Sequence, residues 1–103
     1  MRVKWNERAI SQRSQIAAYI RQNFGAKRKI RFLQEVREAV QRLKRSPHIG
    51  QIDPLFSGRA KTYRSVIING LNKMAYYIEG DTIRIAGFWD TRQEPESQAE
   101  QTE

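Results

Sequence analysis

The sequence predicts an α+β fold in which a two-helix antiparallel hairpin lies on one face of a small sheet. Residues 7–45 repeat apolar side chains at helical spacing, whereas residues 63–89 contain three short runs of alternating polarity separated by glycine-containing turns. These three strands are expected to form an antiparallel meander, and a strand at the N-terminus adds to its edge. The expected order is therefore strand, helix, helix and three strands, in a sheet of four strands.

The first strand and the first helix occupy the start of the chain. Val3 and Trp5 alternate with basic residues, which is typical of a short strand, and Asn6 is a candidate N-cap for the helix that follows. Gly25 is placed to end that helix in a left-handed conformation. The large apolar residues of the helix recur every four positions, so we expect them to form one buried face: Ile16, Ile20 and Phe24.

A second helix is expected from about residue 26 to residue 45, antiparallel to the first because only Gly25 and its neighbours separate the two. Lys44 and Arg45 suit the negative end of the helix dipole, and Pro47 stops the helix. The apolar residues step by three and four positions and form a second core stripe: Leu33, Val36, Val40 and Leu43.

The second half of the chain begins with a loop over residues 46–61, which is long enough to be a functional or partner-ordered segment. Asn69-Gly70 is a strong hairpin-turn signal within the meander. The three strands are expected at residues 63–68, 73–78 and 82–89.

Charge is the strongest signal in the overall composition. Nineteen Lys and Arg residues against eleven Asp and Glu residues give a net charge of +8. Four of these acids lie beyond Arg92, so residues 1–92 carry an excess of twelve positive charges. A single domain of residues 1–92 with this excess should seek a polyanion, either nucleic acid or an acidic protein. Residues 93–103 are expected to form a disordered acidic tail.

The residue inventory excludes several kinds of site. The chain has no cysteine and only one histidine, His48, which excludes disulfides, thiolate metal sites and multi-histidine metal sites. No apolar run is long enough to cross a membrane, and the N-terminus lacks the pattern of a signal peptide. We therefore expect a cytoplasmic protein that uses no metal and no cofactor and has no membrane partner.

A series of short motifs covers residues 2–95. Its clearest members are Val3-Lys4-Trp5, Phe32-Leu33-Gln34-Glu35-Val36, Tyr63-Arg64-Ser65-Val66-Ile67, Met74-Ala75-Tyr76-Tyr77-Ile78 and Trp89-Asp90-Thr91-Arg92-Gln93. In this order they resemble the RelE/ParE superfamily of toxins from bacterial type II toxin–antitoxin systems. The resemblance is closest to the ParE-like, plasmid-stabilisation branch.

The resemblance implies a toxin that inhibits growth and is neutralised by a cognate antitoxin, whose acidic C-terminal segment wraps the toxin in a hetero-oligomer. RelE-like members cleave mRNA on the ribosome, whereas ParE-like members poison DNA gyrase. The long hairpin, the absence of histidine from the strands and the absence of a tyrosine after Arg92 favour the ParE-like side, with gyrase as target. A third hypothesis is an inactive toxin or a basic nucleic-acid-binding module.

Two interpretations compete for the basic residues of the sheet. A metal-free ribonuclease needs a base, an acid and cations that stabilise the phosphorane, and its candidate residues are Lys61, Arg64, Arg84 and Arg92. A non-enzymatic toxin, which we favour, needs residues that bind a target or the antitoxin, and the candidates are Trp89, Asp90, Arg92, Arg64 and Arg84. Strand register decides whether Arg64 and Arg84 share a face.

Overall fold

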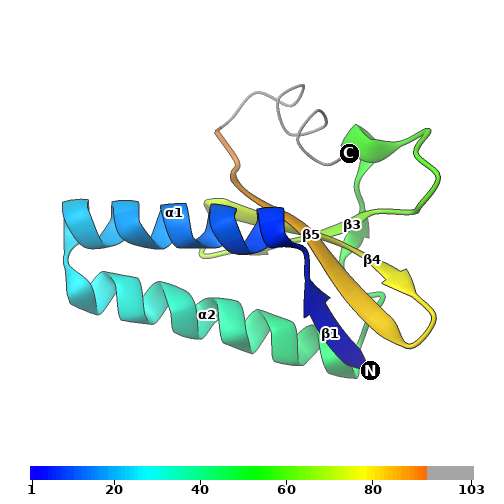
Figure 1. Cartoon of the computed structure of the whole chain (residues 1–103), viewed down its shortest axis with the longest axis horizontal. Coiled ribbons are helices and arrows are strands. Elements are labelled where there is room, and N and C mark those ends of the chain that lie inside the picture. The colour runs from blue at the N-terminus through cyan, green and yellow to red at the C-terminus, as the bar shows by residue number, and fades with distance from the viewer. Residues whose placement is uncertain (93–103) are drawn as a thin grey trace.

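The computed structural model describes residues 1–92, which form one sheet with a two-helix hairpin packed on it (Figure 1). The predicted α+β class and the helical hairpin are confirmed. The expectation of a disordered acidic tail concerns residues 93–103, which lie outside the described residues. The elements are β1 (Arg2–Trp5), α1 (Glu7–Phe24), α2 (Ala26–Arg45), β2 (Gln51–Ile52), a short 3-10 helix η1 (Pro54–Phe56), β3 (Arg64–Ile68), β4 (Asn72–Glu79) and β5 (Thr82–Asp90).

The sheet has five strands in the order β1-β5-β4-β3-β2, so the prediction of four strands is wrong by one. β1 pairs in parallel with β5, whereas β2, β3, β4 and β5 pair antiparallel. The additional strand, β2, lies in the segment predicted as a loop and pairs Gln51 with Ser65 and Ile52 with Arg64. Two residues are too few to show the alternation from which a strand is recognised, so the sequence gives no signal for β2.

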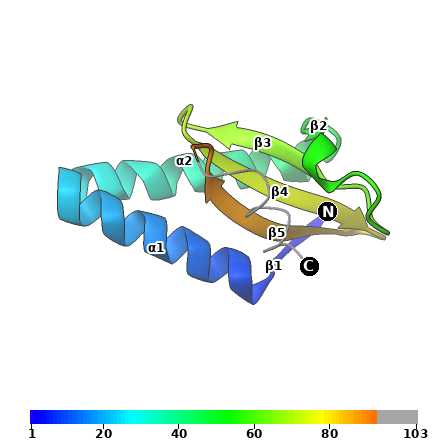
Figure 2. The ribbon, with the colours of Figure 1, turned by 90° about the horizontal axis from the view of Figure 1, so that it is seen from above.

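The hairpin extends beyond the sheet, as Figures 1 and 2 show. α1 ends at Gly25, whose φ of 95° lies in the region that favours glycine and whose amide donates to the Arg21 carbonyl at 3.0 Å. Asn6 stands at the N-cap position of α1, but its side chain makes no capping hydrogen bond, contrary to expectation. No helix in residues 1–92 is long and apolar enough to span a membrane.

The main core lies between the hairpin and the sheet. Phe32 and Val36 of α2 and Ala17 of α1 pack there on Met74, Tyr76, Ile83, Ile85 and Phe88. The Phe32 and Phe88 rings meet edge to face with centroids 5.8 Å apart. Burying these side chains is the main force that holds the hairpin on the sheet.

A second, aromatic cluster lies on the opposite face of the sheet. It contains Phe56, Tyr63, Ala75, Tyr77, Ala86 and Trp89. The Trp89 ring stacks on Phe56 with centroids 5.9 Å apart and covers Gly87, where a side chain would have no room. The segment that contains β2 and η1 therefore covers part of this face instead of forming a free loop.

An ion pair fixes that segment to the sheet. The Lys73 Nζ lies 2.9 Å from a carboxylate oxygen of Asp53, and the two side chains are only 12% and 6% exposed. Asp53 also accepts hydrogen bonds from the Ser65 hydroxyl and from the Leu55 amide. Burial alone would raise the pKa of Asp53, but the hydrogen bonds from Ser65, Lys73 and Leu55, together with the Lys73 charge, lower it.

Candidate binding groove

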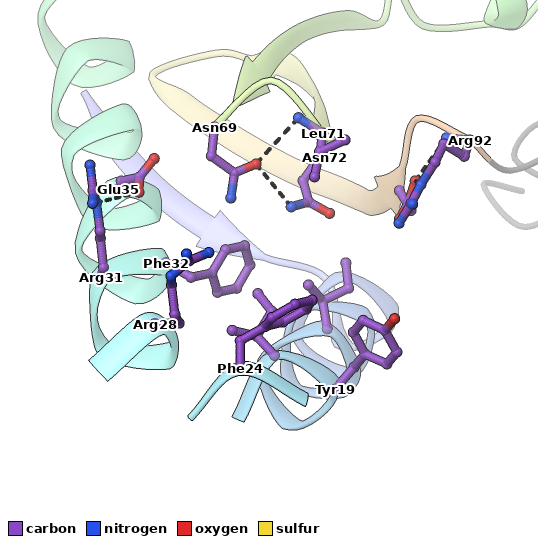
Figure 3. A pocket seen from close by; sticks show the side chains of 13 residues that line it. Tyr19, Phe24, Arg28, Arg31, Phe32, Glu35, Asn69, Leu71, Asn72 and Arg92 are labelled. Atoms are coloured by element: carbon purple, nitrogen blue, oxygen red, sulfur yellow. Dashed lines mark hydrogen bonds and ion pairs between the residues drawn. The ribbon is translucent and has the colours of Figure 1, made fainter. Parts of the chain in front are cut away.

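An open groove lies between the far half of the hairpin and the end of the sheet formed by the β3–β4 turn and the end of β5 (Figure 3). Its volume is about 520 Å³. We call it the aromatic groove. Its lining residues are Ile16, Tyr19, Ile20, Phe24, Arg28, Arg31, Phe32, Glu35, Asn69, Leu71, Asn72, Asp90 and Arg92.

Large apolar side chains at the edge of the groove are exposed to solvent. Tyr19 and Phe24 on α1 are 56% and 58% exposed, and Leu71 on the opposite side is 47% exposed. The Tyr19 and Phe24 rings meet edge to face with centroids 6.3 Å apart. Exposed apolar side chains gathered in a groove are typical of a surface that binds another macromolecule.

The β3–β4 turn holds Leu71 at the edge of the groove. Asn69 and Gly70 both have positive φ, 50° and 77°, as the predicted Asn-Gly turn requires. The Asn69 Oδ1 accepts hydrogen bonds from the Leu71 amide at 3.3 Å and from the Asn72 side-chain amide at 3.2 Å. The Leu71 carbonyl in turn accepts from the Thr91 amide at 2.7 Å, which ties the turn to the end of β5.

Asp90 and Arg92 close one end of the groove as a bidentate pair. Arg92 donates from Nε to Asp90 Oδ1 at 2.9 Å and from a terminal nitrogen to Oδ2 at 2.6 Å, and its amide also donates to Oδ1 at 2.8 Å. The side-chain hydrogen bond from Arg92 lowers the pKa of the Asp90 carboxyl, although partial burial acts in the other direction. The sequence predicted both residues as contacts for a partner, and the structure brings them to the groove.

Most charges of the aromatic groove are neutralised within the chain. Arg92 pairs with Asp90, and Arg31 pairs with Glu35 one helical turn away at 3.6 Å. Arg28 lies over the Phe24 ring, 5.9 Å from its centroid. A partner in this groove would therefore be held mainly by apolar contact.

The sequence did not identify the aromatic surface of this groove. Tyr19 was not a candidate site residue, and Phe24 was expected to be buried with Ile16 and Ile20. The prediction for Phe24 is wrong because the hairpin extends past the sheet and no strand covers its last turn. A sequence shows which residues share a helical face, but it does not show where the covering layer ends.

Arg64 and Arg84, two further predicted site residues, lie on different faces of the sheet. Arg64 lies opposite Tyr76, on the face covered by the hairpin, and donates to the carbonyls of Gly50 at 2.9 Å and His48 at 3.4 Å. Arg84 lies opposite Tyr77, on the other face, and approaches Glu79 at 3.5 Å. The two arginines therefore do not share a face of the sheet.

Lys61 and Arg64 line one pocket together with His48, Tyr77 and Glu79, and neither Arg84 nor Arg92 lines it. The Lys61 Nζ lies 3.3 Å from the Tyr77 hydroxyl and 4.4 Å from the Tyr77 ring centroid, on the face of Arg84. Arg92 follows the far end of β5, where Asp90 is six residues, or roughly 20 Å, from Arg84. Of the four cations considered for a ribonuclease, Lys61 and Arg64 thus share a pocket, whereas neither Arg84 nor Arg92 lines it.

Trp89 lies in the interior. The sequence marked it as a possible contact for a partner, but its side chain is 2% exposed and packs in the aromatic cluster beneath the β2–η1 segment. Its role in this structure is packing. Within residues 1–92, no group of three or more His, Cys, Asp or Glu side chains could hold a metal ion.

Comparison with known proteins connects this architecture to a family. A family model described as the ParE toxin of the type II toxin–antitoxin system parDE matches residues 3–95. A structure described as the chromosomal ParDE toxin–antitoxin system from P. aeruginosa is similar, with 19% identity, a TM-score of 0.71 and coverage of 87% of this chain and 95% of that chain.

A structure of a YoeB dimer from Staphylococcus aureus is also similar, with 20% identity, a TM-score of 0.57 and coverage of 84% of this chain and 92% of that chain. At these identities the two structures support the fold alone. No curated protein sequence matches the chain significantly. The family model spans nearly all of the described residues, and the chain therefore belongs to the ParE toxin family of type II toxin–antitoxin systems.

Proposed function

We propose that this toxin inhibits growth by binding a macromolecular target in the cytoplasm, namely DNA gyrase, and that it does not cleave RNA. Its place in a toxin–antitoxin family implies a cognate antitoxin as partner. The observation that carries the proposal is the open groove lined by exposed aromatic residues, set beside the absence of Arg84 and Arg92 from the pocket that Lys61 and Arg64 share.

RNA cleavage without a metal needs its groups at one phosphate. A base, an acid and the cations that stabilise the phosphorane must all lie within hydrogen-bond reach of the reacting atoms. Arg64 is directed toward the His48 and Gly50 carbonyls on one face, Arg84 lies on the other face, and Arg92 is bound to Asp90 at the far end. These positions do not form a single catalytic site.

The aromatic groove supports action by binding. Tyr19, Phe24 and Leu71 offer apolar area that the toxin leaves exposed, and aromatic residues often provide much of the binding energy at protein interfaces. We assign this groove to the target. The Asp90–Arg92 pair at its end offers polar contacts at the edge of such an interface.

One arrangement favours the ribonuclease as a second candidate. Lys61, Tyr77 and Arg84 lie together on one sheet face, with the Lys61 ammonium at the Tyr77 hydroxyl and Arg84 opposite Tyr77 in the register. The Tyr77 hydroxyl beside the Lys61 ammonium, in a pocket that Arg64 and His48 also line, resembles a general acid beside a phosphate site. The variant Tyr77→Phe separates the two candidates, because it removes the hydroxyl and leaves the aromatic groove intact.

Controlled expression of the toxin without its antitoxin tests the proposal. We expect growth arrest with a DNA-damage response and gyrase trapped on cleaved DNA, and we expect Tyr77→Phe to be equally toxic. Rapid loss of intact mRNA with cuts in phase with the ribosome, abolished by Tyr77→Phe, would instead establish the ribonuclease. Normal growth would favour an inactive toxin or a nucleic-acid-binding module.

Replacing Arg92 by alanine tests the polar end of the groove. We expect Arg92→Ala to weaken growth inhibition several-fold, because it removes the guanidinium and leaves the Asp90 carboxylate unpaired at the proposed interface. The melting temperature should change by no more than about 2 °C, because the pair is exposed. Arg2→Ala, which breaks the exposed Arg2–Asp81 pair elsewhere on the surface, is the matched control. Unchanged toxicity and unchanged antitoxin binding would give Arg92 a purely structural role.

A further inference from the structure

The outer side of α2 carries a strong positive charge. The helix contains eight Lys and Arg residues against two Glu residues among its 20 positions. Its buried residues, Phe32, Val36, Ala39 and Leu43, all face the core, so the opposite side is left to solvent. In Figure 1 that side of α2 forms the lower border of the molecule.

Four cations in the C-terminal part of α2 form what we call the cationic face. All four are exposed, and within residues 1–92 none of them forms an ion pair with a carboxylate. The aromatic groove differs, because its Arg31 and Arg92 are both paired. The negative end of the helix dipole accounts for cations only in the last turn, so it does not explain Arg37, which lies about two turns earlier. The cationic face consists of Arg37, Arg42, Lys44 and Arg45.

The four cations are arranged in two rows along the helix. Arg37 and Lys44 are seven residues apart, which is nearly two full turns, so they lie on the same side of α2. Arg42 and Arg45 are three residues apart and form the other row. Because successive residues are turned by about 100°, Lys44 and Arg45 point to different sides and Gln41 lies between the two rows. The cationic face therefore has a polar, uncharged strip with positive charge on each side.

We propose that the cationic face binds the phosphate backbone of duplex DNA, with α2 seated in the major groove and one row of cations directed at each strand. The major groove of B-form DNA is about 12 Å wide and admits an α-helix, whose diameter with side chains is about 10–12 Å. Phosphates border that groove on both sides, as the two rows require. The major groove of duplex RNA is too deep and narrow to admit a helix in this way.

The chemistry of this surface favours DNA over an acidic protein. Every exposed residue from Arg37 to Arg45 is polar or charged, whereas Ala39 and Leu43 are buried and Val40 is half-buried. Protein–protein interfaces have an apolar centre, which the cationic face does not offer. Protein–DNA interfaces are polar and strongly positive, as this face is. One acid, Glu38, lies on the same exposed side and would repel the phosphates.

The cationic face is separate from the aromatic groove. The residues of α2 that line the aromatic groove are Arg28, Arg31, Phe32 and Glu35, all before the first cation of the face. A protein bound in the aromatic groove would therefore leave the cationic face open to DNA that the same protein holds. The inference goes beyond the proposed function, and it holds whatever the protein target is, because DNA binding would be a property of the toxin alone.

The salt dependence of DNA binding tests the inference. Fluorescence anisotropy of a labelled duplex of about 20 base pairs, titrated with the purified toxin at several KCl concentrations, gives the association constant. Four phosphate contacts predict a slope of about −3.6 for the logarithm of that constant against the logarithm of the salt concentration. Arg42→Gln with Arg45→Gln should bring the slope to about −1.8 and weaken binding at least tenfold, and Arg37→Gln with Lys44→Gln should do the same.

Three comparisons control this measurement. Arg8→Gln with Arg21→Gln removes the same charge from exposed positions of α1 and should leave the slope within about 0.5 of the parent value. Glu38→Gln should strengthen binding several-fold, because it removes the carboxylate that repels the phosphates. Duplex RNA of the same sequence should bind at least fivefold more weakly than the DNA. All these substitutions are at exposed positions, so thermal unfolding should show folded variants.

Several results would overturn the inference. An equal loss of binding in the Arg8/Arg21 variant would show that binding follows net charge and not the cationic face. Loss from only one of the two rows would contradict seating in the groove. A poly-glutamate peptide that binds as tightly as the duplex, with the same loss in both row variants, would assign the face to an acidic protein. A parent chain that does not arrest growth would contradict the proposed function and leave the DNA measurements unaffected.

Discussion

Replacing Asp53 by alanine is expected to lower the free energy of unfolding by about 3 kcal/mol. The change leaves the Lys73 ammonium 12% exposed and without its carboxylate, and it removes the acceptor for the Ser65 hydroxyl and the Leu55 amide. A buried ammonium without a partner carboxylate destabilises the folded state, although the Phe56 ring near Lys73 offsets part of this loss of stability. A decrease of roughly 15 °C in the melting temperature should accompany the change.

Two further variants test whether the stability lost in Asp53→Ala comes from the buried charge of Asp53. Asp53→Asn removes the charge and keeps one oxygen, which can still accept from the Leu55 amide, so its effect should be smaller than that of Asp53→Ala. Asp81→Ala removes the partner of Arg2 in an exposed pair and should leave stability nearly unchanged. If Asp53→Ala and Asp81→Ala lower the free energy of unfolding by the same amount, the Asp53–Lys73 pair does not stabilise the β2–η1 segment.

The same pair gives a defined pH dependence. Because the pKa of Asp53 is lowered in the folded state, the unfolded state binds more protons in the acidic range, and stability rises with pH there. The stability difference between the parent and Asp53→Asn should be fully present above about pH 5 and should be lost as pH falls below about 4, through the lowered folded pKa. Denaturant titrations across this range measure the difference.

Replacing both Tyr19 and Phe24 by serine is expected to reduce growth inhibition by about a hundredfold. Both side chains are more than half exposed, so the folded toxin should keep its stability while losing most of the apolar area of the aromatic groove. If gyrase is the target, the double variant should also fail to trap gyrase on cleaved DNA. Dose–response curves for growth against toxin concentration give the size of the effect.

A control double variant tests whether growth inhibition depends on apolar side chains in the aromatic groove or on exposed apolar side chains in general. Ile10→Ser with Ile67→Ser removes two other exposed apolar side chains, on α1 and β3, that do not line the aromatic groove. This control should remain toxic. Toxicity of the Tyr19/Phe24 variant equal to that of the parent would exclude the aromatic groove as the target surface.

Most of the fold could be predicted from local patterns. The spacing of Leu33, Val36 and Leu43 placed α2, Asn69-Gly70 placed the β3–β4 turn, and alternating polarity placed β3 to β5. These signals work because helical and strand periodicity are local properties of the backbone. β2 was missed because a strand of two residues is defined by its partner, not by its own sequence.

The candidate site was harder to predict, because it depends on contacts between distant residues. Asp90 and Arg92 are two residues apart, and a local turn joins them in the structure. The separation of Arg64 from Arg84 depends on the register of three strands, and the burial of Trp89 depends on a covering segment more than thirty residues earlier in the chain.

The sequence by itself determined the order of the helices and the meander, the excess of positive charge and the resemblance to the ParE toxin family. The tertiary structure alone decided how those charges are used. It paired Lys73 with Asp53 and Arg92 with Asp90, it left the four cations of the cationic face exposed on α2, and it exposed Tyr19 and Phe24. The reason is physical: periodicity acts within a few residues, whereas burial and ion pairing depend on which distant segments meet.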